Sequence, residues 1–98
     1  MKTKYMYISA PITGLSPKVV NKVFSDAEKE VAQLGFNPIN PLTLTDSGMS
    51  YGECIGVDIQ ELIDSASAVY FCKGWEKSKG CMLEFAAAKI YEKEMHFE

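Results

Sequence analysis

The sequence predicts an α/β sandwich, in which helices cover both faces of a small, mostly parallel β-sheet. Short apolar segments alternate with longer segments whose apolar residues recur at helical spacing, in the order β-α-β-α-β-α-β. In addition, residues 68–72 (AVYFC) form a continuous apolar run, which is typical of a strand buried on both faces. A chain of 98 residues is expected to form one domain, residues 1–98.

The first strand and the first helix are predicted for the N-terminal third of the chain. Residues 4–9 (KYMYIS) form the strand, and residues 10–15 (APITGL) form the turn-rich loop after it. Ser16 and Pro17 suit the N-cap and the first position of a helix, and Gly35 suits its end. The apolar residues at helical spacing between them are Val19, Val20, Val23, Phe24, Ala27, Val31 and Leu34.

The central part of the chain is predicted to contain a short strand, a loop and a second helix. Residues 36–39 form the strand, and residues 41–49, which show no periodicity, form the loop. The run Ser50-Tyr51-Gly52-Glu53 has the capping-box pattern, so the second helix covers residues 51–64. The residues expected on its buried face are Ile55, Ile59 and Leu62.

The C-terminal part begins with the third strand and is predicted to contain one more helix and strand. Residues 75–79 form a loop, and a third helix runs from residue 79 or 80 to residue 91. Residues 95–97 form a short fourth strand. The residues expected on the packing stripe of the third helix are Leu83, Ala86, Ala87 and Ile90.

This topology predicts the place of a ligand pocket. In open parallel sheets, ligands bind beyond the carboxyl ends of the strands, where the strand order reverses. The loops at residues 10–15 and 73–80 both lie at that edge of the sheet.

Composition excludes several classes of protein and site. The net charge is −3 and no Lys/Arg cluster is present, so binding to a nucleic-acid duplex is not expected. No apolar run approaches the roughly 18 residues of a membrane helix, and the N-terminus lacks the apolar core of a signal peptide. The three cysteines form no CxxC pair, which argues against a disulfide framework and a zinc site. We therefore expect a cytoplasmic protein that uses no metal.

Glu84 is the most informative candidate for chemistry. A polar loop bounded by glycines, residues 74–80, leads into the third helix, and Glu84 lies on the second turn of that helix. A loop and helix start of this kind can hold an anion on its backbone N–H groups, with the carboxylate facing the rest of the ligand. A nucleotide is the ligand that this arrangement suggests. The alternative is that Glu84 is an ordinary solvated acid on the helix surface.

Asp58 and Tyr7 are expected to converge on the same place. Asp58 lies about 60° from Ile55 around its helix, on the border of the apolar face, where it is either a structural hydrogen-bond acceptor or a site residue. Tyr7 lies near the end of the first strand, on the same face as Tyr5. Packing is the usual role of a strand tyrosine, but a buried hydroxyl needs a polar partner, which Asp58 or Glu84 could supply.

Three residues around the glycine-bounded loop can each have either a structural or a functional role. Ser78 fits the N-cap of the third helix, which is also where a phosphate would dock. Trp75 fits either stacking on a nucleobase or closing the loop. Cys81 lies near the proposed site, and packing is favoured over a reactive thiol because a free cysteine often behaves as a small hydrophobe.

Three motifs of the chain resemble those of nucleoside 2-deoxyribosyltransferase-like proteins. Residues 7–14 (YISAPITG) resemble the first-strand motif of that family, and Asp58-Ile59 followed by residues 68–71 resembles the second. Residues 74–80 (GWEKSKG), followed by residues 83–88 (LEFAAA), resemble the third. The resemblance covers nearly the whole chain and implies a flavodoxin-like or Rossmann-like three-layer sandwich.

The resemblance also implies an activity: cleavage or transfer of the N-glycosidic bond of a (deoxy)nucleoside or its 5′-monophosphate, without a cofactor. By position, Glu84 matches the nucleophile that forms a covalent ribosyl-glutamate intermediate, and Tyr7 matches the tyrosine that orients it. Asp58 matches the acid near the base and sugar, and Ser78 matches a phosphate-binding serine. The substrate-binding positions implied by the motifs are Ser9, Pro11, Ile12, Gly14, Gly74, Trp75, Ser78 and Gly80.

The chain departs from the family pattern in three places. Ala10 replaces a usual glycine, Ser67 replaces a common aspartate, and the chain ends soon after its fourth strand, where family enzymes carry further segments. The second hypothesis is therefore a binding module that holds a nucleotide without turnover. In either case we expect a homodimer or a higher homo-oligomer. The aromatic residues that could line its interface are Tyr51, Trp75, Tyr91 and Phe97.

Overall fold

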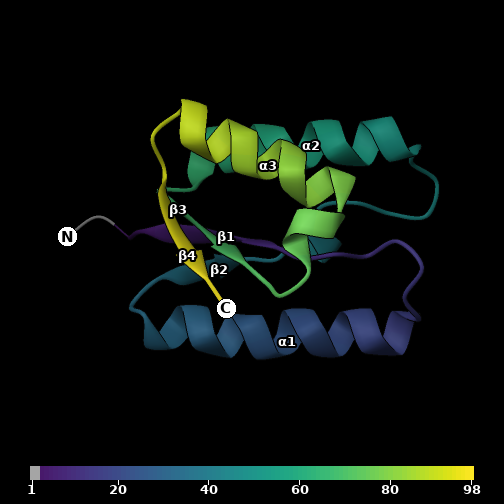
Figure 1. Cartoon of the computed structure of the whole chain (residues 1–98), viewed down its shortest axis with the longest axis horizontal. Coiled ribbons are helices and arrows are strands. Elements are labelled where there is room, and N and C mark those ends of the chain that lie inside the picture. The colour runs from purple at the N-terminus through teal and green to yellow at the C-terminus, as the bar shows by residue number, and fades with distance from the viewer. Residues whose placement is uncertain (1–2) are drawn as a thin grey trace.

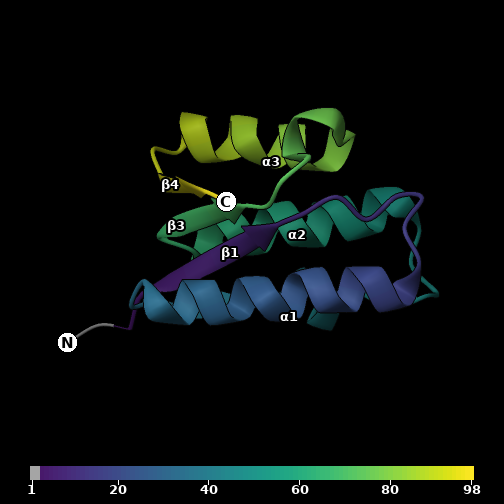
Figure 2. The ribbon, with the colours of Figure 1, turned by 60° about the horizontal axis from the view of Figure 1, so that its bottom comes forward.

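Four parallel strands form one sheet in the order β2-β1-β3-β4, and helices cover both of its faces. The computed structural model describes residues 3–98. One long helix, α1, lies on one face, and α2 and α3 lie side by side on the other (Figures 1 and 2). The predicted α/β three-layer sandwich is therefore confirmed. The elements are β1 (Tyr5–Ser9), α1 (Pro17–Gln33), β2 (Asn37–Ile39), α2 (Tyr51–Ser65), β3 (Ala68–Phe71), α3 (Lys79–Ile90) and β4 (Glu94–Phe97).

The helices begin where short-range sequence signals place them. The hydroxyl oxygen of Ser16 accepts a hydrogen bond from the Val19 amide at the start of α1. At the start of α2, Ser50 and Glu53 form the reciprocal bonds of a capping box. The chain leaves α1 through Gly35, whose φ of 91° lies in the left-handed region that favours glycine. Each of these features was predicted from residues at most three or four positions apart.

The predicted loops contain two short 3₁₀ turns. These turns, Pro41–Thr43 (η1) and Trp75–Lys77 (η2), follow the carboxyl ends of β2 and β3. Gly74 precedes η2 with a φ of 88°, so glycine permits the turn that leads from β3 toward α3.

Two apolar layers hold the sandwich together. Side chains of β1 and β3 alternate between the two faces, so each strand contributes to both layers. The layer under α1 is built from residues such as Met6, Ile8 and Phe24. The layer under α2 and α3 contains Leu62, Val69 and Phe71. Because Tyr7 and Ser9 alternate with Met6 and Ile8, both lie on the face covered by α2 and α3.

The packing stripe predicted for α3 is wrong except for Ala87, which packs against the core layer under α2 and α3. Leu83 is 50% exposed and Ile90 is 73% exposed, whereas Cys81, Glu84 and Ala88 are buried. The helix is apolar around most of its circumference, so periodicity alone does not identify the face that meets the sheet.

The buried face predicted for α2 is correct only in part. Leu62 is fully buried and Asp58 is nearly so, while Ile55 and Ile59 remain half-exposed. Both α2 and α3 therefore turn a carboxylate toward the sheet. Among residues 3–98, no helix has the length and apolar character needed to cross a membrane.

Candidate active site

Glu84 is held from two sides by hydroxyl groups of β1. The Tyr7 hydroxyl donates to Oε2 of Glu84 and the Ser9 hydroxyl donates to Oε1, both at 2.6 Å. Tyr7 and Ser9 are two residues apart on a strand, so their side chains point to the same face of the sheet. All three side chains are buried, and the carboxylate is therefore fixed in one orientation.

The position of Glu84 follows from where α3 begins. The hydroxyl oxygen of Ser78 caps this helix by accepting from the Cys81 amide, and Glu84 lies six positions after the cap. At 3.6 residues per turn, that spacing places Glu84 on the second turn, above the carboxyl half of β1. Burial raises the pKa of Glu84 to about 7, the Ser9 and Tyr7 hydrogen bonds lower it, and the charge of Asp58 raises it.

Asp58 is the second carboxylate of the site, and one of its oxygens has no partner. It is 8% exposed, and its Oδ1 is buried without a hydrogen bond. Burial raises the pKa of Asp58 to about 6, and a hydrogen bond with Tyr7 opposes this rise. A buried polar atom without a partner is costly, so Oδ1 is suited to meet a hydrogen-bond donor of a ligand or to carry a proton itself.

Tyr7 links the two carboxylates. Burial and the neighbouring charges of Glu84 and Asp58 raise its pKa far above the ordinary value, so the hydroxyl keeps its proton. The Tyr7 hydroxyl has one proton, which it donates to Oε2 of Glu84 at an oxygen–oxygen distance of 2.6 Å. Its hydrogen bond with Asp58 is therefore the weaker of the two. Two hydroxyl donors therefore stabilise the ionised form of Glu84. Because the two pKa values are close, the carboxylates titrate as a coupled pair, and the form with Glu84 ionised and Asp58 protonated is one of the two that hold a single proton.

A small hollow lies in front of the carboxylates, at the edge of the sheet where topology predicts a pocket. Its volume is about 60 Å³. Six of the sequence-predicted residues line it: Tyr7, Asp58, Glu84, Ile12, Ser78 and Gly80. The lining residues not identified from the sequence are Ile8, Ala10, Thr13, Phe24, Pro41, Tyr51, Ile55 and Cys81.

Gly80 lets α2 and α3 approach each other beside this hollow. A Cβ atom at this position would lie 3.3 Å from Cδ1 of Ile55 and 3.4 Å from the hydroxyl oxygen of Tyr51. Tyr51 is the first residue of α2, so its ring reaches the pocket from the opposite helix start. The capping-box signal located this residue in the sequence, but no local signal showed that it faces Gly80.

The other predicted binding residues support the site or shape its loops instead of lining the hollow. Ser9 contacts Glu84 rather than lining the hollow. Gly14 and Gly74 adopt positive φ angles of 83° and 88°, which shape the two loops. A Cβ atom on Gly74 would lie 3.5 Å from Pro11, so these two predicted residues meet where the loops approach each other.

Trp75 is packed in an aromatic cluster instead of lining the hollow. Its ring stacks on Phe85 with centroids 4.8 Å apart and lies 5.2 Å from the ring of Phe71. The ring of Phe97 completes the cluster. These contacts correspond to the loop-closing interpretation of Trp75.

The two cysteines near the core are buried. Burial raises the pKa of the Cys72 thiol to about 12, and it also raises that of Cys81. Both thiols are therefore protonated at neutral pH and suit packing better than nucleophilic chemistry. Within residues 3–98, no cluster of three or more His, Cys, Asp and Glu side chains could hold a metal ion.

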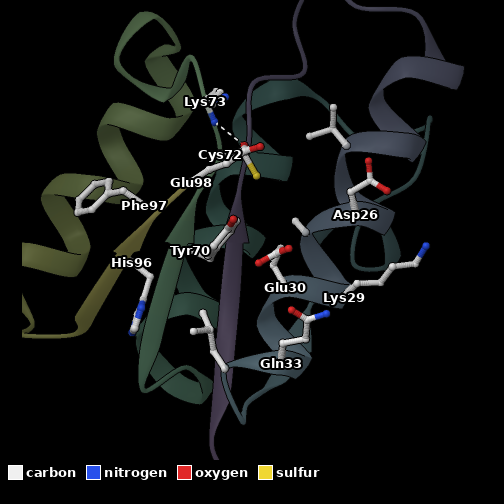
Figure 3. Close-up of a pocket in the computed structure, with 13 residues that line it drawn as sticks. Asp26, Lys29, Glu30, Gln33, Tyr70, Cys72, Lys73, His96, Phe97 and Glu98 are labelled. Atoms are coloured by element: carbon white, nitrogen blue, oxygen red, sulfur yellow. Dashed lines mark hydrogen bonds between the residues drawn. The ribbon is translucent and has the colours of Figure 1, made fainter.

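A much larger hollow, about 880 Å³, lies on the opposite face of the sheet (Figure 3). It lies between α1 and the edge of the sheet formed by β3 and β4, with Glu30 and Tyr70 on opposite walls. The one buried side-chain oxygen without a hydrogen bond in the described part of the chain belongs to Asp58, on the other face. The larger hollow is therefore on the α1 side of the sheet, whereas the side chains suited to catalysis, Glu84 and Asp58, lie on the other side.

A family model described as a domain of unknown function (DUF4406) matches residues 4–97. A comparison with curated proteins gave no match.

Proposed function

The chain belongs to the DUF4406 family, and from the geometry of its site we propose that it cleaves or transfers the N-glycosidic bond of a (deoxy)nucleoside or its 5′-monophosphate. The observation that carries this proposal is Glu84, a buried carboxylate held on both oxygens and facing a second carboxylate across Tyr7. The resemblance of three motifs to nucleoside 2-deoxyribosyltransferase-like proteins supports the same chemistry.

In the first step, ionised Glu84 attacks the anomeric carbon of the sugar. The carbon–nitrogen bond breaks through an oxocarbenium-like transition state, and its electron pair remains on the base nitrogen. Protonated Asp58 transfers its proton to the departing base, which leaves as a neutral molecule. The sugar is then esterified to Glu84, and Asp58 is ionised.

In the second step, the ester is opened by water or by another base. Asp58 takes the proton of the incoming nucleophile while its oxygen or nitrogen attacks the anomeric carbon. The ester oxygen returns to Glu84 as a carboxylate, and Asp58 is again protonated. Tyr7 and Ser9 do not react, because their role is to orient Glu84 and stabilise its charge.

The start of α3 is suited to the phosphate of a 5′-monophosphate. Backbone N–H groups at a helix N-terminus attract anions, and Ser78 and Gly80 at this end line the hollow. Gly80 is the second residue of α3 and has no side chain that could screen its amide from an anion. In this arrangement the phosphate lies near Ser78 while the anomeric carbon lies near Glu84.

Substrate binding requires the pocket to widen. A hollow of about 60 Å³ holds one or two waters, whereas pockets for drug-sized ligands are about 300–1,000 Å³. Ile12 and Thr13, which are exposed residues of the loop after β1, border the hollow. We propose that outward movement of this loop admits the nucleoside.

The thiols of Cys54, Cys72 and Cys81 are all free. Free thiols persist in a reducing compartment, which supports a cytoplasmic location.

The test is an assay of base release by liquid chromatography. The protein is incubated with a panel of nucleosides and 5′-monophosphates, with and without an acceptor base, beside Glu84→Ala and the control Glu28→Ala on α1. Base release by the wild type and the control, but not by Glu84→Ala, is the expected result. Release that persists in Glu84→Ala would contradict the proposed role of this carboxylate.

A binding module without turnover is the second candidate. The narrow hollow favours it, as does the engagement of both Glu84 oxygens by hydrogen bonds. A ligand that binds only the native state raises the melting temperature. A nucleotide that raises it without base release from any substrate would select this candidate, and the absence of any shift and any release would contradict both.

A further inference from the structure

The wall that α1 presents to the large hollow is apolar except for one acid. The hollow has a volume of about 880 Å³ and lies between α1 and the edge of the sheet. Four of its lining residues recur along α1 at intervals of three or four positions, so they share one face of the helix: Val23, Ala27, Glu30 and Leu34. Glu30 falls about 20° from Val23 around the helix. Its carboxylate therefore belongs to this otherwise apolar face, which we call the α1 wall.

The opposite wall supplies a second carboxylate and a tyrosine hydroxyl. Glu98 follows β4, and its Oε1 accepts a hydrogen bond from the Lys73 amide at 2.9 Å. Tyr70 of β3 is only 6% exposed, and its hydroxyl points into the hollow (Figure 3). No hydrogen bond joins this hydroxyl to another lining residue in that view. Tyr70 therefore keeps its capacity to donate and to accept a hydrogen bond within the hollow.

The two carboxylates lie near the same hydroxyl. Burial raises the pKa of Tyr70, and the charges of Glu98 and Glu30 raise it further. The hydroxyl is therefore protonated at neutral pH. Two carboxylates that face one enclosed space repel each other, and a cation placed between them relieves the repulsion. The hollow is thus suited to a positively charged group.

Positive side chains of the protein do not fill this role. Lys29 borders the hollow but points away from the sheet, whereas Glu30 points toward Tyr70 (Figure 3). Within residues 3–98, no lysine forms an ion pair with Glu30 or Glu98. The other titratable groups at the rim have neighbours of their own, since Asp26 contacts Lys22 and His96 contacts Glu94.

We propose that this hollow is a second ligand site and that its ligand is a small organic amine. The ammonium group lies among Glu30, Glu98 and the Tyr70 hydroxyl, and the hydrocarbon chain lies along the α1 wall. An ammonium has three donors and no acceptor, which matches two carboxylates and one hydroxyl oxygen. The volume of about 880 Å³ is within the range of small-molecule sites.

This site is separate from the proposed glycosidic chemistry. It lies on the α1 side of the sheet, whereas Glu84 and Asp58 lie on the side covered by α2 and α3. Binding of the amine can therefore be measured without turnover, and its failure would leave the proposed function untouched. A probe of a few heavy atoms in an open hollow should bind with a dissociation constant on the order of millimolar.

Amide NMR of the isotope-labelled chain tests the charge of the ligand. The probes are hexylamine, hexanol and hexanoate, which share one hydrocarbon chain, at matched pH and ionic strength. Hexylamine should shift the amide signals of Glu30, Tyr70 and Glu98 to saturation and leave those of Asp58 and Glu84 in place. Hexanol should bind more weakly, and hexanoate should not bind. No saturable shift with hexylamine, or equal binding of either other probe, would overturn the proposal.

Substitutions at the two carboxylates test which residues hold the ammonium. Glu30→Gln and Glu98→Gln should each weaken hexylamine binding by about three- to fivefold, as expected for ion pairs open to solvent. Glu30→Lys should abolish hexylamine binding and admit hexanoate. The matched control is Glu28→Gln, because Glu28 is on the same helix and does not line the hollow. Melting temperature and the dispersion of the spectra establish that each variant is folded. Equal affinity in Glu30→Gln, Glu98→Gln and the control would contradict the proposed site.

Discussion

Tyr7 and Glu84, which are 77 residues apart in the sequence, are joined by a 2.6 Å hydrogen bond between two buried side chains. This contact fastens the second turn of α3 to the central strand of the sheet. Ser9 adds a second bond of equal length to the other carboxylate oxygen. The carboxylate therefore has a fixed orientation and an environment in which burial and hydrogen bonding oppose each other.

Replacement of Tyr7 by phenylalanine is expected to raise the pKa of Glu84. The variant removes a donor to a charged group, which is worth about 1.5–3 kcal/mol, so the acidic limb of the pH–rate profile should move up by about 1 to 2 pH units. The measurement is kcat/KM for base release against pH. Tyr5→Phe is the matched control, because Tyr5 lies on the same strand and is 41% exposed. An unmoved limb in Tyr7→Phe would show that this bond does not tune Glu84.

Ser9→Ala is expected to act through the same carboxylate. It should move the acidic limb in the same direction as Tyr7→Phe, because the Ser9 bond also lowers the pKa of Glu84. Two residues that act on one group are not independent, so the double variant should deviate from the sum of the single effects. Strict additivity in the double-mutant cycle would argue against a shared action on Glu84.

Stability should fall as pH rises from 5 to 8. Burial raises the pKa of Glu84 from 4.5 to about 7 and that of Asp58 from 3.8 to about 6. The native state therefore binds protons more tightly than the unfolded chain. The stabilisation is complete below the unfolded-state values and is lost as pH rises through the native ones. For Glu84 the loss amounts to at most about 3 kcal/mol.

Glu84→Gln should remove much of that pH dependence. A loss of this size corresponds to roughly 10 °C or more in a domain of this length, so the melting temperature of the variant should vary less between pH 5 and 8. Thermal denaturation followed by circular dichroism measures this variation, with Glu30→Gln, an exposed acid of α1, as control. An unchanged slope in Glu84→Gln would mean that Glu84 does not titrate in this range.

Asp58→Asn is expected to impair departure of the base. Loss of a general acid typically costs about 10²–10⁴ in rate. The defect should be large for natural bases and small for a substrate whose leaving group departs as a stable anion, such as a nitrophenyl deoxyriboside. The ratio of kcat values for the two substrates measures it. Equal losses on both would assign Asp58 a binding role instead.

Ser78→Ala separates capping from phosphate recognition. Loss of the cap should cost about 1 kcal/mol of stability. If the start of α3 holds a phosphate, KM should also rise for a 5′-monophosphate but not for the matching nucleoside. Ser16→Ala removes the equivalent cap of α1 and serves as the control. A KM for the monophosphate that rises no more than in Ser16→Ala would place the phosphate elsewhere.

Much of the fold was determined by short stretches of sequence. Ser16, Ser50 and Ser78 each cap a helix within three residues of their own position, and Gly35 ends α1 in a conformation that glycine adopts at low cost. The alternation of strands and helices then fixed the layers, since each apolar face had to be covered. The proximity of the loop after β1 to the start of α3 followed from the same topology.

Tertiary structure alone decided which side of α3 meets the sheet. Leu83 and Ile90 looked like packing residues, yet they are exposed, and Glu84 is buried in their place. On a helix that is apolar nearly all round, the hydrophobic effect does not distinguish the faces. The choice depends on Tyr7 and Ser9, whose hydroxyls satisfy the buried carboxylate. These partners are 77 and 75 residues away from Glu84, so no local pattern encodes the contact.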